Sequence, residues 1–385
     1  MMNYEKFKVA VKHNIRKYLP ESEKESDILI QTIEKNNKVK LDSLCVKRET
    51  EKISPVIYLN EYFEKYISGD SLEEILENMA GAIMDAKEES LNFKVDLLTG
   101  YSHVKDSLVL SVCNYEKNKT MLKDIPHEVN GDFAITVRYQ CFGGNGTVHI
   151  KDSLLEHFGI SKEQLFMDAY DNSPQYAPYK FQSMIDVLCE MMPDFDPEYD
   201  LGVAEGPSMY VLTNEQKLFG AAAIFYPGVL ENISKELQSD LHIIPSSIHE
   251  VIIVTGDGFD SDTLQRMIRE VNSTQVEPQD VLGDKPYTYD AIEKKIVPMV
   301  QYEKHMYAIK EGIKKTGYQP TQKLVNGMRK LEKVTGLRPE LKDIYVLAKS
   351  VTKDSDTKLK EAINEIAKEC KAQQLMMHPG IEPGM

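Results

Sequence analysis

A nucleophile, a base and a carboxylate occur together in the five residues Ser246-Ser247-Ile248-His249-Glu250. These are the groups of a hydrolytic triad, but catalysis needs a serine hydroxyl within hydrogen-bond distance of the imidazole. In a strand, Ser247 and His249 merely point to the same side, and the GxSxG turn that exposes a catalytic serine is absent. We therefore interpret the segment as a structural corner that leads into a strand, with a polar ligand site or a hydrolytic site as the alternatives.

A second candidate pair, Cys141 and His149, flanks the glycine-rich segment 143–146. Alternating residues on either side predict a hairpin over 133–142 and 147–150. A loop of two or four residues places Cys141 and His149 on opposite faces, whereas a three-residue loop pairs them across the hairpin. A Cys–His dyad therefore depends on the loop length, and we do not expect a functional one.

Two segments resemble ligand-binding loops without completing the motif. Acidic residues alternate from Asp194 to Asp200, with Glu205 at the twelfth position as in an EF-hand calcium loop, but Tyr199 stands where that loop needs glycine. Gly256-Asp257-Gly258 looks like a phosphate-binding turn but has no GK[ST] or GxGxxG motif behind it. The cysteines form no CxxC pair; they are Cys45, Cys113, Cys141, Cys189 and Cys370. We therefore expect neither a metal site nor a cofactor.

The segment 321–335 predicts an amphipathic helix with one apolar and one basic side. The apolar side holds Leu324, Val325, Met328, Leu331 and Val334, and the basic side holds Lys323, Arg329, Lys330 and Lys333. Two further helices are predicted behind it, so we expect a three-helix tail. A basic helical face can bind the phosphates of nucleic acid or an acidic protein partner, and a purely structural appendage is the third alternative.

The remaining periodicity predicts an α+β fold. Segments rich in β-branched residues are typical of strands, and apolar residues at helical spacing are typical of amphipathic helices. We expect strands at 28–33, 39–46, 56–59, 133–142, 147–150, 208–212, 220–226, 241–245 and 250–254, with an edge strand at 296–299. Capping patterns at Asp70 with Glu73 and at Asp262 with Gln265 predict two helix N-termini. Because strands and helices do not alternate regularly, we expect mixed, mainly antiparallel sheets packed by helices.

Charge divides the chain into an acidic body and a basic tail. The 385 residues include 46 Lys and Arg and 61 Asp and Glu, a net charge of −15. Residues 303–385 carry 16 basic and 11 acidic side chains, which leaves −20 for the preceding part. The length suffices for two or three domains. We expect a two-lobed body with lobes at 1–170 and 208–302, an acidic Pro-, Met- and Tyr-rich linker at 171–207, and a helical tail at 303–385.

The start Met1-Met2-Asn3-Tyr4-Glu5 lacks the apolar stretch of a signal peptide, and no apolar run approaches the roughly 20 residues of a membrane span. We therefore expect a cytoplasmic protein that does not contact membranes.

Six segments carry a family resemblance: NYEKF at 3–7, PVIYLN at 55–60, YVLTN at 210–214, GAA at 220–222, IIPSSIHEVIIV at 243–254 and VNSTQV at 271–276. Over about residues 1–300 they resemble an uncharacterised family of gut Firmicutes, often carried on mobile elements. It implies a shared fold and a bacterial host but transfers no catalytic residues.

We therefore expect a non-catalytic binding or adaptor protein with an unidentified protein partner. The alternatives are nucleic-acid binding through the basic C-terminal helices and a hydrolase that uses Ser246, Ser247 and His249, with Glu250 beside them.

Overall fold

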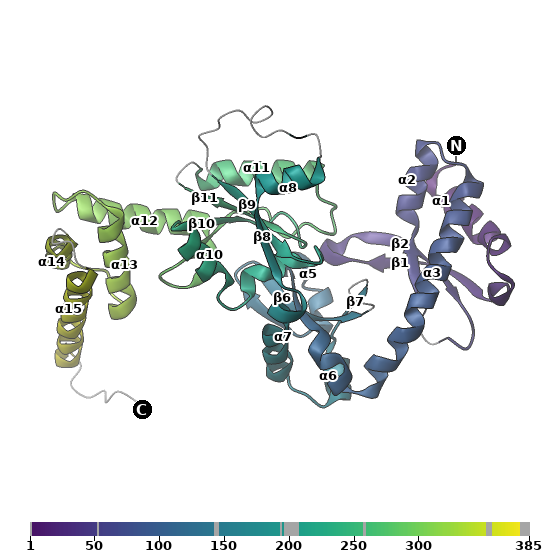
Figure 1. The fold of residues 1–385 in the computed structure, drawn as a ribbon, viewed down its shortest axis with the longest axis horizontal. Helices are drawn as coiled ribbons and strands as arrows, with labels where there is room; N and C mark the ends of the chain where they lie inside the picture. The colour runs from purple at the N-terminus through teal and green to yellow at the C-terminus, as the bar shows by residue number, and fades with distance from the viewer. Residues whose placement is uncertain are drawn as a thin grey trace.

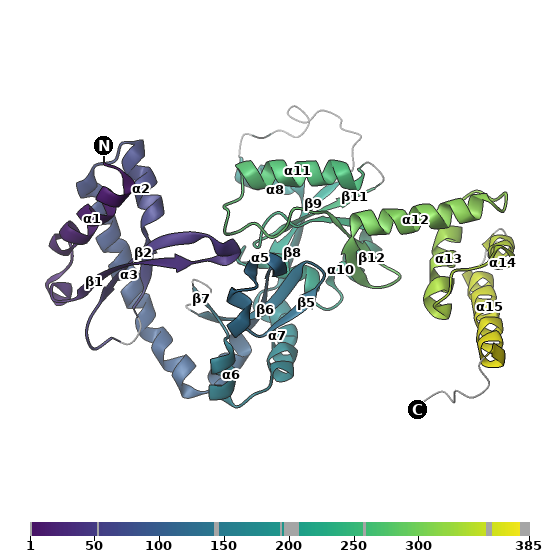
Figure 2. The same ribbon diagram turned by 180° about the vertical axis from the view of Figure 1, so that it is seen from behind.

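The computed structural model describes residues 2–51, 54–141, 146–192, 195, 208–256, 259–351 and 356–377 (Figure 1). About 54% of the structure is helical and 22% forms strands, and the described strand pairs are antiparallel, which confirms the α+β fold. Figures 1 and 2 show an N-terminal lobe and a helical tail at opposite ends of a central body. Among the described residues, none of the helices combines the length and the apolar character that a membrane span requires.

The N-terminal lobe packs three helices against a three-stranded sheet of order β1-β2-β3. Its elements are α1 (Tyr4–Asn14), β1 (Asp27–Glu34), β2 (Lys40–Lys47), β3 (Val56–Tyr58), α2 (Leu59–Ser68) and α3 (Leu72–Thr99). Phe7, Leu44 and Met79, from α1, β2 and α3, are fully buried in its core. The three predicted strands are confirmed. Because α3 has 28 residues and rises about 1.5 Å per residue, it carries the chain from this lobe to the central body (Figure 1).

The central body contains two sheets. The four-stranded sheet consists of β4 (Leu108–Asn114), β5 (His127–Asn130), β6 (Phe133–Cys141) and β7 (Gly146–His149), with β6 paired to the other three. The six-stranded sheet has the order β13-β12-β10-β11-β9-β8. Its strands are β8 (Tyr179–Ser183), β9 (Met209–Asn214), β10 (Leu241–Ile244), β11 (Val251–Thr255), β12 (Tyr287–Asp290) and β13 (Lys295–Pro298). The proline-containing strand β13 lies at the edge, as predicted.

Helices and one shared hydrophobic core hold the two sheets together. The helices are α4 (Tyr101–Val104), α5 (Tyr115–Asn118), α6 (Asp152–Phe158), α7 (Lys162–Tyr176), α8 (Met184–Met191), α10 (Val229–Leu237) and α11 (Ser261–Thr274). Val137 from the first sheet and Ile253 from the second are both fully buried in a core that extends from Val104 to Tyr289. The packing therefore joins residues from both sides of the expected linker at 171–207, and the domain limits drawn from composition stay predictions.

The strand predicted over 220–226 is wrong, because Gly220–Phe225 form a 3-10 helix, η7. A short run of small apolar residues does not distinguish a buried strand from a buried helical turn. A Cβ atom on Gly220 would lie 2.3 Å from Thr213 Oγ1 and 2.6 Å from the backbone oxygen of His249. Only glycine fits there, and the fit brings η7 directly against the corner at His249.

Two predicted helix N-termini are also displaced. α3 begins with a capping box of Ser71 and Glu74 in place of Asp70 and Glu73. α11 is capped by Asp260, whose carboxylate accepts the backbone N–H of Thr263 at 2.8 Å, so Asp262 is not the cap. In both places neighbouring side chains satisfy similar sequence patterns, and the local backbone decides between them.

The tail contains four described helices, one more than predicted. They are α12 (Met299–Lys314), α13 (Gln322–Thr335), α14 (Leu341–Val351) and α15 (Asp356–Met377). Ile309, Val325, Leu347 and Ile363 contribute one residue from each helix to a common core. Thr321 caps α13 and Gly336 ends it.

The tip of the β1–β2 hairpin docks on the central body (Figure 2). The Asn37 side-chain amide donates to the backbone oxygens of Pro278 at 3.0 Å and Val281 at 2.7 Å. The Asn37 backbone N–H donates to Asn118 Oδ1 at 2.7 Å, and Asn36 Nδ2 donates to the backbone oxygen of Gln279 at 2.6 Å. The lobe is thus attached to the body by this hairpin tip as well as by α3.

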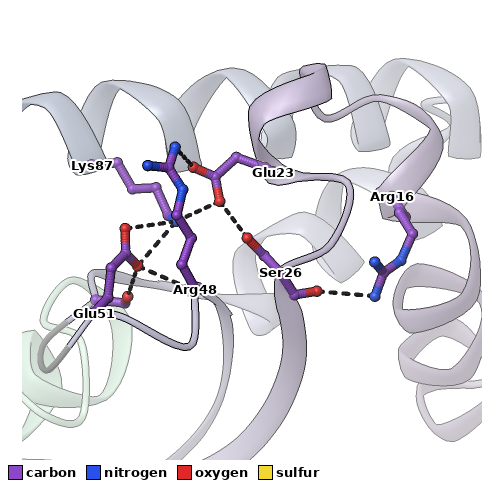
Figure 3. Close-up of polar contacts among 7 residues, drawn as sticks. Arg16, Glu23, Ser26, Arg48, Glu51 and Lys87 are labelled. Carbon is purple, nitrogen blue, oxygen red and sulfur yellow. Dashed lines mark hydrogen bonds and ion pairs between the residues drawn. The ribbon is translucent and has the colours of Figure 1, made fainter.

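A buried ion cluster stabilises the N-terminal lobe (Figure 3). The Glu23 carboxylate is fully buried and accepts from Lys87 Nζ at 2.7 Å, Ser26 Oγ at 2.6 Å and Arg48. Lys87 also contacts Glu51 at 3.2 Å. Burial by itself would raise the pKa of Glu23. The hydrogen bonds from Lys87, Ser26 and Arg48 together lower it by more than burial raises it, so the pKa lies below its usual value. The cluster ties α3 to the segments before β1 and after β2.

We expect Glu23→Gln to destabilise the lobe by about 3 kcal/mol at pH 7, because it leaves Lys87 with one carboxylate partner in a buried site. Native-state hydrogen exchange of the β1–β2 amides measures this free energy of opening. A carboxyl with a lowered pKa stabilises the fold above its unfolded pKa of about 4.5, and this contribution is lost as the pH falls. The difference between wild type and variant should therefore shrink below pH 4.5. Glu25→Gln, at an exposed neighbour, is the control; an equal effect of both changes would contradict the role of the cluster.

Candidate functional site

The corner at residues 246–250 does not form a nucleophile–base pair. Ser246 and Ser247 are buried, and Ser247 Oγ accepts the backbone N–H of His249 at 3.0 Å. The His249 imidazole instead accepts the backbone N–H of Phe219 at Nδ1, at 3.2 Å, and its Nε2 lies 3.6 Å from Asp280 Oδ1. Glu250, immediately before β11, is half-buried. The hydroxyl and the imidazole therefore serve separate backbone contacts, and a polar ligand site at these residues stays a prediction.

The register of the β6–β7 hairpin separates Cys141 from His149. Cys141 is opposite Gly146, so the loop has four residues, and the cross-strand partner of His149 is Arg138. The backbone register thus pairs His149 with Arg138 and not with Cys141, whose side chain lies outside what the structure describes.

The Arg138 guanidinium contacts three neutral groups. One terminal nitrogen donates to Thr147 Oγ1 at 2.9 Å, and the other lies 2.5 Å from His149 Nε2. The guanidinium carbon is 4.1 Å from the centre of the Phe219 ring, a cation–π contact. Burial lowers the pKa of Arg138 to about 10, so the side chain is still charged at pH 7. The site therefore holds a positive charge on neutral partners.

His149 is neutral at pH 7. Burial lowers its pKa well below the usual value, and the positive charges of Arg138, Lys151 and Lys35 lower it further. Because a guanidinium can only donate, Nε2 is the accepting nitrogen and the ring proton is on Nδ1. Arg138 Nε and His149 Nδ1 are both buried without a hydrogen-bond partner among the described residues. Both of these unsatisfied groups are donors.

A cavity of about 630 Å³ adjoins this pair, between the N-terminal lobe and the central body. The lobe contributes the hairpin residues Lys35, Asn36 and Leu41 together with Tyr58. The body contributes Arg138, His149, Phe219 and Ile248, together with other residues of β4, β6 and β7. It also contributes Gln279 and Asp280 from the loop that contacts the hairpin tip. The volume falls in the usual range of small-molecule sites, about 300–1,000 Å³.

Phe219 links the corner at His249 to the pair of Arg138 and His149. Its φ of 54° is left-handed, a conformation that bulky residues rarely adopt. The hydrogen bond to His249 and a ring contact of 5.5 Å between the two centroids hold it there, next to Gly220. The other neighbour of the Phe219 ring is the Arg138 guanidinium. His249 is thus a positioning residue for one wall of the cavity.

The loop motifs considered from the sequence give no ligand site in the described chain. The acidic segment 194–205 lies outside the described residues, except for Phe195, as do Asp257 and Gly258. Among the described residues, no group of three or more His, Cys, Asp or Glu side chains is placed to hold a metal ion.

The four basic residues predicted on α13 do not share one exposed face. Arg329 is 5% exposed and pairs with Asp290, and it donates to Tyr302 Oη at 3.2 Å. Lys333 donates to the backbone oxygen of Ile292, Lys330 is exposed, and Lys323 is half-buried. Helical periodicity places Arg329 near the lysines, but its contact partner is β12 of the body. Anion or partner binding by these residues stays a prediction.

A second cavity, of about 720 Å³, lies at this junction between body and tail. Its buried cation, Arg329, pairs with Asp290, His305 Nε2 lies 2.7 Å from Glu332, and the lining residues Lys304 and Arg338 are exposed to water. The cavity beside Arg138 differs because this half-buried residue, whose Nε is fully buried, has no carboxylate partner among the described residues. We therefore take the Arg138 cavity as the candidate functional site.

Comparison with known proteins identifies the class of this chain. Residues 4–291 match the model of a family of unknown function, DUF5688, and the chain belongs to that family. The match ends just after β12. It therefore includes the β1–β2 hairpin, the Arg138 cavity and every strand of the two body sheets except β13, and it excludes the tail helices. Searches of curated proteins and of solved structures found no match.

Sequence reasoning missed Arg138 and Phe219. Arg138 is the one charged residue of strand β6, whose sequence is FAITVRYQC. A charge within a strand that is otherwise apolar indicates either an exposed face or a buried site, and that signal was present in the sequence. Phe219 gave no such signal, because its left-handed backbone and its two contacts arise from distant segments.

We expect Arg329→Met to release the tail from the body, because Asp290 then remains buried without its cation, a loss of about 3–5 kcal/mol. Small-angle scattering should show a larger radius of gyration, and limited proteolysis should cut faster between 290 and 299. Lys330→Met, at the exposed neighbour, should change neither. An unchanged radius for Arg329→Met would show that the apolar contacts of α12 hold the tail without the ion pair.

Proposed function

We propose that this chain is a non-catalytic binding protein that takes a small molecule into the cavity beside Arg138. The observation that carries the proposal is the construction of this cavity from two lobes, with the hairpin tip attached to the body by the hydrogen bonds of Asn36 and Asn37. Ligand sites are commonly found between lobes or domains, where mostly apolar walls surround a few convergent polar groups.

The reactive groups near the cavity support binding over catalysis. Ser247 Oγ and the His249 imidazole contact separate backbone groups. Cys113 lines the cavity, but burial raises the pKa of its thiol to about 12, so it stays protonated and weakly nucleophilic at neutral pH. His149 is held by Arg138 and has no neighbouring nucleophile among its described contacts.

The proposal also covers the host of this protein, its location in the cell and a protein partner. The resemblance to proteins of gut Firmicutes supports a bacterial host and a mobile-element context, and the polar N-terminal segment supports a cytoplasmic location. A protein partner on the tail would make the chain an adaptor whose body responds to the ligand; the exposed lysine Lys330 supports an acidic partner for this surface.

We expect Val148→Phe to abolish ligand binding, because Val148 lines the cavity and the larger ring fills part of it. The measurement is a thermal-shift screen of a metabolite library against wild type and variant. A ligand at 100 times its Kd stabilises the folded state by about 2.7 kcal/mol, which is readily seen as a rise in Tm.

Val129→Phe, at an exposed position of β5 in the same sheet, is the matched control and should keep every hit. Leu41→Phe tests the opposite wall, so that a folding defect of one variant does not decide the result. Hits that bind both cavity variants as well as wild type, or a library without any hit that these variants weaken, would contradict the proposal.

A further inference from the structure

We infer that the ligand of this cavity carries an oxyanion, a carboxylate or phosphate group, that binds at Arg138 and His149. This inference rests on the proposed function, since it names the chemical class of the ligand for the same site. It is carried by the charge balance and by the hydrogen-bond balance of the pair.

The positive charge of Arg138 has no anion beside it among its described contacts. Burying a guanidinium is costly unless an opposite charge compensates it. The chain meets this requirement elsewhere: Arg329 is buried against Asp290, and Lys87 is buried against Glu23. The contacts of Arg138 are a threonine hydroxyl, a neutral imidazole and a phenyl ring, and none of them carries a negative charge.

Two hydrogen-bond donors of the Arg138–His149 pair lack an acceptor among the described residues. Arg138 Nε–H and His149 Nδ1–H are the unsatisfied groups on this wall of the cavity, and both donate. Carboxylate and phosphate oxygens are strong acceptors, and the planar guanidinium binds them with parallel hydrogen bonds. On the lobe side, Asn36 Oδ1 is an unsatisfied acceptor, since Asn36 Nδ2 is used by Gln279. An oxyanion at one end of the ligand and a hydroxyl or amine at the other would satisfy both walls.

The acidic residues around the cavity do not supply the missing anion. Glu34 and Glu61 are exposed, where water screens their charge. Asp280 also lines the cavity, but its nearest described basic group is His249 Nε2 at 3.6 Å, and no ion pair joins it to Arg138 among the described residues. Lys35 and Lys151, in contrast, are close enough to affect His149 and add to the positive potential. The cavity therefore selects for an anion at its Arg138 wall.

The experiment measures binding of phenyl phosphate and inorganic phosphate to the full chain by calorimetry at pH 7, with phenol as the neutral probe. Phenyl phosphate should bind, because Val148, Phe219 and Ile248 provide apolar walls for its ring. Arg138→Gln should weaken it at least tenfold, and Arg138→Lys should retain an intermediate affinity because it keeps the charge without the planar donors. Arg269→Gln, at an exposed site on α11, is the control and should bind as wild type.

Thermal stability gives a second readout that does not depend on a tight ligand. Phosphate should raise the Tm of wild type more than an equal ionic strength of chloride does, and this difference should disappear in Arg138→Gln. Without phosphate, Arg138→Gln should be at least as stable as wild type, because it removes a buried charge that has no partner.

The outcomes separate the two proposals. If library hits are lost in Val148→Phe while neutral compounds bind as well as anions and Arg138→Gln changes nothing, the anionic class is wrong and the binding cavity stands. If phenyl phosphate binds equally to wild type, Val148→Phe and Arg138→Gln, it binds elsewhere and both proposals fail. If phenyl phosphate and phosphate neither bind wild type nor raise its Tm, the oxyanion site is overturned.

Discussion

The contact on which the junction of lobe and body depends is the insertion of one asparagine side chain between two segments that are far apart in the sequence. Asn37 adopts a left-handed backbone with φ of 60°, which asparagine tolerates better than most residues. In that conformation its amide reaches the carbonyls of Pro278 and Val281 while Asn118 Nδ2 donates to its Oδ1. The cavity has a wall from the N-terminal lobe because of this contact, since α3 alone would attach the lobe at one place.

The treatment of buried charge distinguishes the cavity from the rest of the molecule. Glu23 has three donors, and Arg329 has Asp290 and Tyr302. These clusters join elements: α3 to the sheet of the lobe, and α13 to β12. Among the described residues, Arg138 contacts only neutral groups and no carboxylate. One of these groups, the Phe219 ring, belongs to a residue with an uncommon left-handed backbone. In our proposal the charge that compensates Arg138 comes from outside the chain.

Local patterns were sufficient for much of the fold. Alternating residues in 133–141 and the glycine-rich loop after them are enough to predict the hairpin, since strand periodicity and turn chemistry act within a few residues. They were insufficient where burial comes from distant segments. The run at 220–226 was predicted as a strand because its composition is apolar, but Gly220 packs against Thr213 and His249, and this close approach requires a 3-10 turn. Arg329 was placed with the basic residues of α13 for the same reason: helical periodicity contains no information about Asp290.

The sequence by itself determined the α+β class, most strands, the helical character of the tail and the absence of a complete catalytic motif. These properties follow from spacing and residue type, which act locally along the chain. Only the tertiary structure decided that His149 is opposite Arg138, that His249 holds Phe219 and that both adjoin one cavity. The physical reason is that a site's electrostatics depend on which charges lie within a few ångströms, and here those charges come from the hairpin, β6 and the loops at 219, 248 and 280.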